Sequence, residues 1–95
     1  MADYERSTVL PPEEVFARAR ETFTRRAELN SMEESDLRVT YSGGEGTVSL
    51  DAHRHGPYTV VTATTDRLRT SKLDGVVRHL LNQLPFQHGD PGWQG

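Results

Sequence analysis

The sequence predicts a small α+β protein, a two-layer sandwich in which two helices cover one face of a three- or four-stranded antiparallel sheet. Two segments carry apolar residues at helical spacing, three show the alternation of a strand, and the strands follow one another through short turns. The predicted order is (β)-α-β-β-β-α. The 95 residues allow one domain, which we place at residues 1–85, followed by a flexible C-terminal tail at residues 86–95.

The first helix is expected to begin at Pro11-Pro12 and to run to about Leu29. Proline suits a first helical turn because its missing N–H would have no partner there. Glu13 and Glu14 complement the positive end of the helix dipole. The apolar stripe of this helix consists of Val15, Phe16, Ala19, Phe23 and Ala27.

Three strands are expected after this helix, within residues 37–42, 47–53 and 58–65. The last of them, Tyr58–Thr65, is rich in β-branched residues and is the strongest candidate for a central strand. Tyr4–Leu10 is a candidate edge strand ahead of the helix, whereas residues 30–36 read as a polar connector.

The second helix is expected to begin at Ser71, because Asp74 follows three residues later as in a capping box. Pro85 ends it. Its apolar stripe consists of Leu73, Val76, Val77, Leu80, Leu81 and Leu84.

The composition excludes several classes of function. The chain has no cysteine, so disulfides, thiolate metal sites and thiol catalysis are excluded. It has no basic leader followed by an apolar run and no apolar stretch of membrane-spanning length, so we expect a cytoplasmic protein without a membrane partner. A net charge of −3 argues against a nucleic-acid partner.

Asp51, His53 and His55 form the most concentrated group of chemically active side chains. Residues two apart in a strand point to the same face, so all three are expected to project together. Two imidazoles and a carboxylate are a suitable ligand set for a transition metal. The alternative is a polar, solvated face that leads into a turn.

Arg67, Arg69 and Lys72 lie between the last strand and the last helix. They form a candidate site for an anion or for nucleic-acid phosphates at a helix N-terminus. The favoured alternative is a solvated junction that Asp66 and Asp74 partly neutralise. No catalytic nucleophile and no cofactor motif is recognisable, which favours a non-enzymatic protein without a cofactor.

Three families share features with this chain. The helix–strand–strand–strand–helix order with Ser71-Lys72 at the last helix resembles the double-stranded-RNA-binding domain over residues 12–84, without the lysine cluster of that family. With a leading strand, the order is also similar to that of ribosome-hibernation factors, whose helices are more basic. The segment Ser7–Phe16 is similar to the opening of the longer helix-grip proteins of the START and polyketide-cyclase type. The chain is not assigned to any of these families.

Three functions follow as expectations. The first is a small non-catalytic binding or protein-interaction domain, with a protein partner or a homodimer formed through a sheet edge. The second is an RNA- or ribosome-associated module that uses the basic residues before the last helix. The third, which the helix-grip resemblance implies, is a protein that binds a metal or small ligand.

Overall fold

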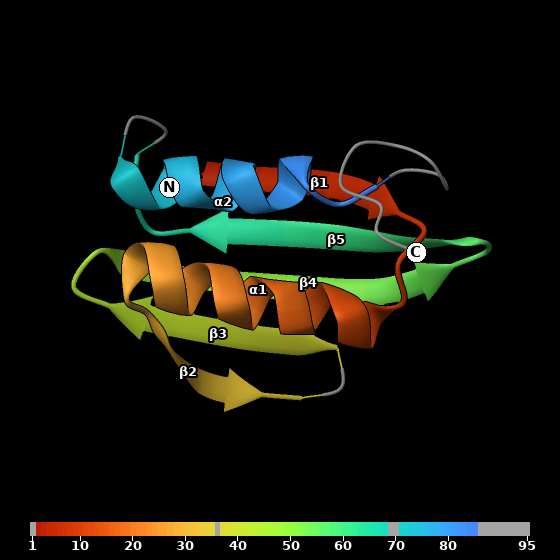
Figure 1. The fold of residues 1–95 in the computed structure, drawn as a ribbon, viewed down its shortest axis with the longest axis horizontal. Coiled ribbons are helices and arrows are strands. Elements are labelled where there is room, and N and C mark those ends of the chain that lie inside the picture. Colours follow the sequence, from red (N-terminus) through yellow and green to blue (C-terminus); the bar gives the residue numbers. More distant parts are fainter. Residues whose placement is uncertain (1, 36, 69–70, 86–95) are drawn as a thin grey trace.

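A computed structural model describes residues 2–35, 37–68 and 71–85 of the chain. Five strands form one antiparallel sheet in the order β1-β5-β4-β3-β2, and the two helices lie over one face of it (Figure 1). The elements in chain order are β1 (Ala2–Thr8), α1 (Pro12–Ala27), β2 (Asn30–Glu34), β3 (Arg38–Gly43), β4 (Gly46–His55), β5 (Tyr58–Thr65) and α2 (Lys72–Asn82).

The sheet is larger than the three or four strands expected, because β1 and β2 each form an edge of it. The sequence predicts a candidate edge strand at Tyr4–Leu10, and β1 is an edge strand at Ala2–Thr8. The prediction of a polar connector at residues 30–36 is wrong, because β2 lies there. β2 pairs with β3 and contains a bulge between Ser31 and Glu33. Strand pairing engages backbone groups that every residue has, so this polar segment joins the sheet without an alternating apolar pattern.

Helix α1 ends at Ala27, two residues before the predicted end at Leu29. Glu28 adopts the left-handed conformation, with φ of 53°, and the N–H of Leu29 bonds to the carbonyl of Phe23 at 3.0 Å. This reversal brings the chain against the end of β3. A Cβ atom on Gly43 would lie only 2.9 Å from the Glu28 carbonyl oxygen, so the close approach requires glycine there.

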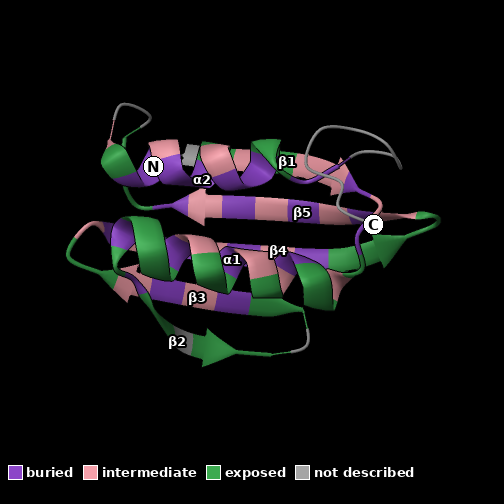
Figure 2. Ribbon diagram, viewed as in Figure 1, coloured by how far each residue is buried: buried purple, intermediate pink, exposed green. Residues whose placement is uncertain are grey.

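The core lies between the helices and the sheet, where strand residues alternate between buried and more exposed positions (Figure 2). The rings of Phe23 on α1 and Tyr41 on β3 contact each other with centroids 4.9 Å apart. The other fully buried side chains of large volume include Leu29, Leu50, Leu73, Leu80, Leu84, Val15, Val48, Val61 and Val77.

The strand β5 lies inside the sheet, between β1 and β4, as the composition of Tyr58–Thr65 predicted. Helix α2 begins after Ser71, whose hydroxyl accepts a hydrogen bond from the N–H of Asp74 at 3.2 Å, which confirms the predicted cap. Neither of the helices described here is long and apolar enough to cross a membrane.

Candidate functional site

The predicted metal ligands Asp51, His53 and His55 alternate along β4, and both histidines are exposed. The carboxylate of Asp51 is bound by Arg38 on the neighbouring strand. Arg38 Nε donates to both carboxylate oxygens at 3.1 and 3.2 Å, and Nη2 donates to Oδ2 at 2.8 Å. The hydrogen bond and the charge of Asp51 raise the pKa of Arg38. No group of three or more His, Asp or Glu residues in the described ranges is arranged to hold a metal ion.

The predicted anion site lies between β5 and α2, and its two described members each face a carboxylate. Arg67 Nε lies 3.6 Å from Asp66 Oδ1, and Lys72 Nζ lies 3.7 Å from Glu45 Oε1. Arg69 falls outside the described residues. Local acidic residues thus offset both described cations. Asp66 is one of the two acids that the solvated-junction interpretation named, whereas Lys72 faces Glu45, and Asp74 is bound by Tyr4 and Arg78.

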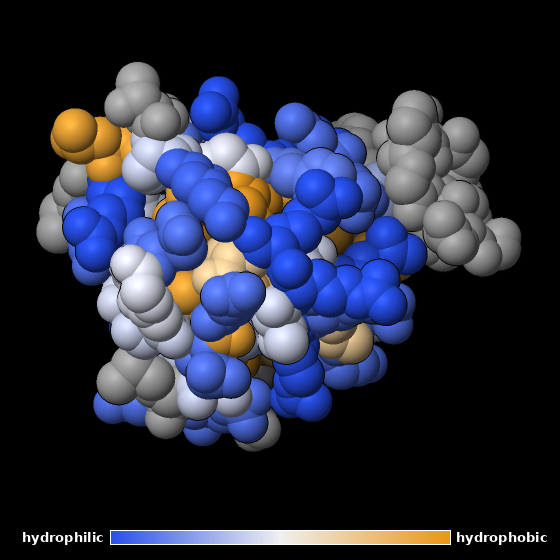
Figure 3. Space-filling view, turned by 60° about the vertical axis from the view of Figure 1, so that its left-hand side comes forward, coloured by the Kyte–Doolittle hydropathy of each residue, from blue (hydrophilic) through white to orange (hydrophobic). Residues whose placement is uncertain are grey.

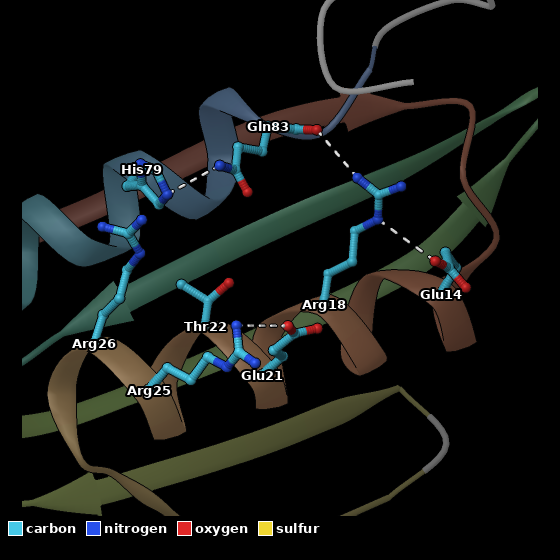
Figure 4. A pocket seen from close by; sticks show the side chains of 8 residues that line it. All are labelled: Glu14, Arg18, Glu21, Thr22, Arg25, Arg26, His79 and Gln83. Carbon is cyan, nitrogen blue, oxygen red and sulfur yellow. Dashed lines mark hydrogen bonds and ion pairs between the residues drawn. The ribbon is translucent and has the colours of Figure 1, made fainter. Parts of the chain in front are cut away.

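A groove of about 430 Å³ runs between the two helices on the outer surface (Figure 4). We call it the interhelical groove. Positions three and four apart on a helix share one side, so α1 lines the groove with polar residues over about three turns, from Glu14 to Arg26, and α2 over about one. Its lining residues are Glu14, Arg18, Glu21, Thr22, Arg25, Arg26, His79 and Gln83.

Two of the three arginines in the groove already have a carboxylate partner on the same helix. Arg18 Nε lies 3.5 Å from Glu14 Oε1, and Arg25 Nη1 lies 3.4 Å from Glu21 Oε1. Arg18 also donates to the backbone carbonyl of Gln83 at 3.4 Å, which joins α1 to the end of α2. In these two ion pairs, the carboxylates of Glu14 and Glu21 offset the charges of Arg18 and Arg25 along α1.

Arg26 is the exception. Within the part of the chain that the structure describes, no carboxylate lies at ion-pair distance from its guanidinium. The side chain reaches from α1 toward His79 on α2 (Figure 4). The amide nitrogen of Gln83 lies 2.9 Å from His79 Nε2 and donates to it. Arg26 therefore adds an uncompensated positive charge beside the polar groups of α2.

A second hollow, of about 570 Å³, lies between α1 and β2 and is more apolar. Phe16 and Val39 contribute to its apolar lining. Arg20 on α1 forms an ion pair with Glu34 on β2, with Arg20 Nη2 3.1 Å from Glu34 Oε1. Tyr41 is buried close by. Burial raises the pKa of Tyr41 to about 12, while the charge of Arg20 lowers it and that of Glu34 raises it.

The remaining surface offers little for apolar recognition. Leu37 and Leu68 are the large hydrophobic side chains found exposed among the described residues. On the side that Figure 3 brings forward, hydrophilic side chains predominate and the hydrophobic areas between them are small and separate. Polar and charged contacts are thus the main means of recognition on this side.

The sequence analysis did not predict the interhelical groove, and it singled out none of Thr22, Arg26 and Gln83. Glu14–Arg18 and Glu21–Arg25 read as ordinary pairs on one helix, and His79 reads as a residue at the rim of the apolar stripe. The available signal was Arg26, a cation in the last turn without an acidic residue three or four positions before it. That signal becomes specific only when α2 lies beside α1.

No protein-family model and no curated protein matches this chain.

Proposed function

We propose that this protein is a non-catalytic binding domain whose interhelical groove holds an anionic group, a carboxylate or a phosphate, of a small ligand. The observation that carries this proposal is the unmatched guanidinium of Arg26 beside Thr22, His79 and Gln83. Guanidinium groups bind carboxylate and phosphate oxygens through two parallel N–H donors.

The geometry of the groove supports a small ligand. Its volume of about 430 Å³ lies within the range of small-molecule sites. Thr22 and Gln83 add neutral hydrogen-bonding groups around the cation. The whole chain carries a net charge of −3, so attraction of an anion depends on this local cation rather than on the overall field.

Binding at the surface also agrees with the packing of the interior. Side chains from both helices meet the sheet in one continuous core, and the hollows described above open at the surface. This favours a surface groove over an enclosed cavity as the place where a small ligand binds.

The test is a titration of the full chain with sodium acetate and, separately, with inorganic phosphate, followed by backbone amide chemical shifts. The amides of Thr22, Arg26, His79 and Gln83 should shift together, with a dissociation constant on the order of 1–10 mM for such simple probes. Sodium chloride at equal ionic strength separates binding from screening.

The decisive variant is Arg26→Gln, and the matched control is Arg54→Gln. Arg54 is also an exposed arginine, but it lies on β4 outside the lining of the groove. Arg26→Gln should weaken binding about three- to tenfold, and the control should leave it unchanged. Equal loss in both variants, or shifts scattered over the surface, would show that the groove is not the site.

The two anions distinguish the ligand class. Preference for acetate assigns a carboxylate ligand, and preference for phosphate assigns a phosphate ester. Retention on heparin with a steep salt dependence would instead favour the RNA-associated function, which uses Arg67 and Lys72 rather than Arg26.

A further inference from the structure

The sheet face turned away from the helices, here called the open face, is built mainly from short hydroxyl side chains. Serine and threonine lose little rotamer freedom when another surface covers them, whereas lysine, arginine and glutamate lose much. Covering the central part of this face with another surface therefore costs little side-chain conformational entropy. Its hydroxyl residues, all half-buried, are Ser7, Thr40, Ser42, Thr47, Ser49, Thr62 and Thr64.

Part of this hydroxyl array already has its hydrogen bonds inside the sheet. The hydroxyls of Thr40 and Ser49 lie 3.2 Å apart across β3 and β4, and those of Ser42 and Thr47 lie 3.0 Å apart. Covering a polar group is costly only when its hydrogen bonds are lost. These four side chains keep theirs when water is removed.

Three charged residues of the open face, Glu5, Asp51 and Arg38, stand in one row across the sheet, whereas Asp3 and Glu33 lie in the neighbouring row with Thr64 and Thr40. The strand register places Glu5 opposite Thr62, Thr62 opposite Asp51, and Asp51 opposite Arg38. Directly opposed residues share a face of the sheet. Glu5 on β1 and Arg38 on β3 therefore lie in the same row, on either side of the central strands β5 and β4.

We propose that the open face binds a second copy of this chain, with a two-fold axis parallel to the strands and midway between β4 and β5. Rotation about that axis exchanges β1 with β3 and β5 with β4. It places Glu5 of each copy opposite Arg38 of the other, so the symmetric contact contains this ion pair twice. The bonds of Arg38 to Asp51 use Nε and Nη2, which leaves Nη1 for the glutamate.

The sheet edges are less suitable for self-association. The edge strand β2 is interrupted by a bulge, and Glu33 and Glu34 stand exposed on it. At the other edge, β1 carries Asp3, Glu5 and Arg6. Bulges and charges on edge strands oppose pairing with another chain, whereas they leave a face-to-face contact free.

The size of the open face fits a weak, reversible dimer. The four strands that overlap in this arrangement, β1, β5, β4 and β3, lie about 4.8 Å apart and are about eight residues long, which gives a contact face of about 500 Å². A standard interface buries about 800 Å² on each partner. With few apolar groups on the face, the expected dissociation constant is on the order of 10–100 μM.

The test is sedimentation equilibrium of the full chain from low to high micromolar concentration. The unmodified protein should pass from monomer to dimer. Glu5→Arg should abolish dimerisation because it sets arginine against Arg38, and Arg38→Glu should abolish it by setting glutamate against Glu5. An equimolar mixture of these two variants should recover a heterodimer, because both cross-copy contacts again join opposite charges.

Two further variants distinguish a loss of dimerisation from a loss of folding. Ser49→Arg inserts a bulky charge on β4 opposite the uncharged Thr64 of the other copy, and should abolish the dimer while the circular dichroism spectrum stays unchanged. Glu13→Arg makes the same charge change as Glu5→Arg on the exposed part of α1, and should leave the dimer intact. A monomeric wild-type protein at high micromolar concentration, a mixture without heterodimer, or a dimer that survives Ser49→Arg would each overturn the proposal.

Discussion

The hydroxyl of Tyr4 on β1 donates a hydrogen bond to the carboxylate of Asp74 on α2, 70 residues later in the chain. Asp74 is fully buried and also faces Arg78, whose Nε lies 3.3 Å from Oδ2. The other carboxylate oxygen, Oδ1, has no hydrogen-bond partner among the described residues. A buried carboxylate depends strongly on each of its partners, so this contact ties the edge strand to the helix that covers it.

Tyr4→Phe should therefore destabilise the protein by about 1–3 kcal/mol, because it removes the hydroxyl and leaves a buried carboxylate short of a donor. In a domain of this size that loss should lower Tm by several degrees, about 4–8 °C per kcal/mol. Thermal unfolding followed by circular dichroism measures it. If Tyr4→Phe melts like the unmodified protein, the hydroxyl does not stabilise the fold.

Two residues from different helices should contribute strongly to the core. Phe23 and Leu80 are both fully buried, and Phe23 packs on Tyr41. Phe23→Ala and Leu80→Ala should each cost about 2–5 kcal/mol in denaturant unfolding, because each leaves a cavity. Leu68→Ala is the control, since Leu68 is 71% exposed and its truncation should change little. Unchanged unfolding in both core variants would contradict the packing.

The raised pKa of Tyr41 predicts a loss of stability at high pH. Its pKa is about 12 in the folded protein and about 10 in an unfolded chain. Folding therefore favours the neutral phenol, and this stabilisation is present below about pH 10 and is lost as the pH rises toward 12. Tyr41→Phe should lose less stability across that window. Equal losses in both proteins would show that Tyr41 does not titrate in this way.

A further prediction concerns the C-terminal segment 86–95, which lies outside the described residues. Truncation after Pro85 should leave Tm nearly unchanged, provided that Pro85 itself remains. The carbonyl of Pro85 accepts hydrogen bonds from the N–H of Val9 at 3.0 Å and from the hydroxyl of Thr8 at 2.6 Å. Removal of Pro85 as well should therefore be destabilising. A large loss on truncation after Pro85 would mean that Phe86 or Trp93 packs on the domain.

The sequence predicts those helices and strands that have one buried face and one exposed face. Alternation in Val48, Leu50 and Ala52 and the helical stripe around Phe23 located their elements, because burial leaves a periodic trace in the sequence. The strand Asn30–Glu34 leaves no such trace. Its place depends on backbone pairing with β3, which any sequence can make.

The candidate site was less predictable than the fold. Asp51 was grouped with His53 by spacing along one strand, but its carboxylate binds Arg38 across the sheet. That partner depends on the register between β3 and β4, which spacing along one chain segment does not encode. The interhelical groove likewise arises only when Arg26 and His79 are brought together by the packing of two helices.

The pairing of β1 with β5 affects how the protein folds during its synthesis on the ribosome. The ribosome makes β1 first, but its only neighbour in the described sheet appears after α1 and three further strands have been made. At about 5–20 residues per second, β1 waits for several seconds with its backbone groups unpaired. The sheet can close only once nearly the whole domain has been synthesised. Contacts between such distant segments also slow folding, so nascent chains stalled before β5 should be sensitive to proteases and should recruit chaperones.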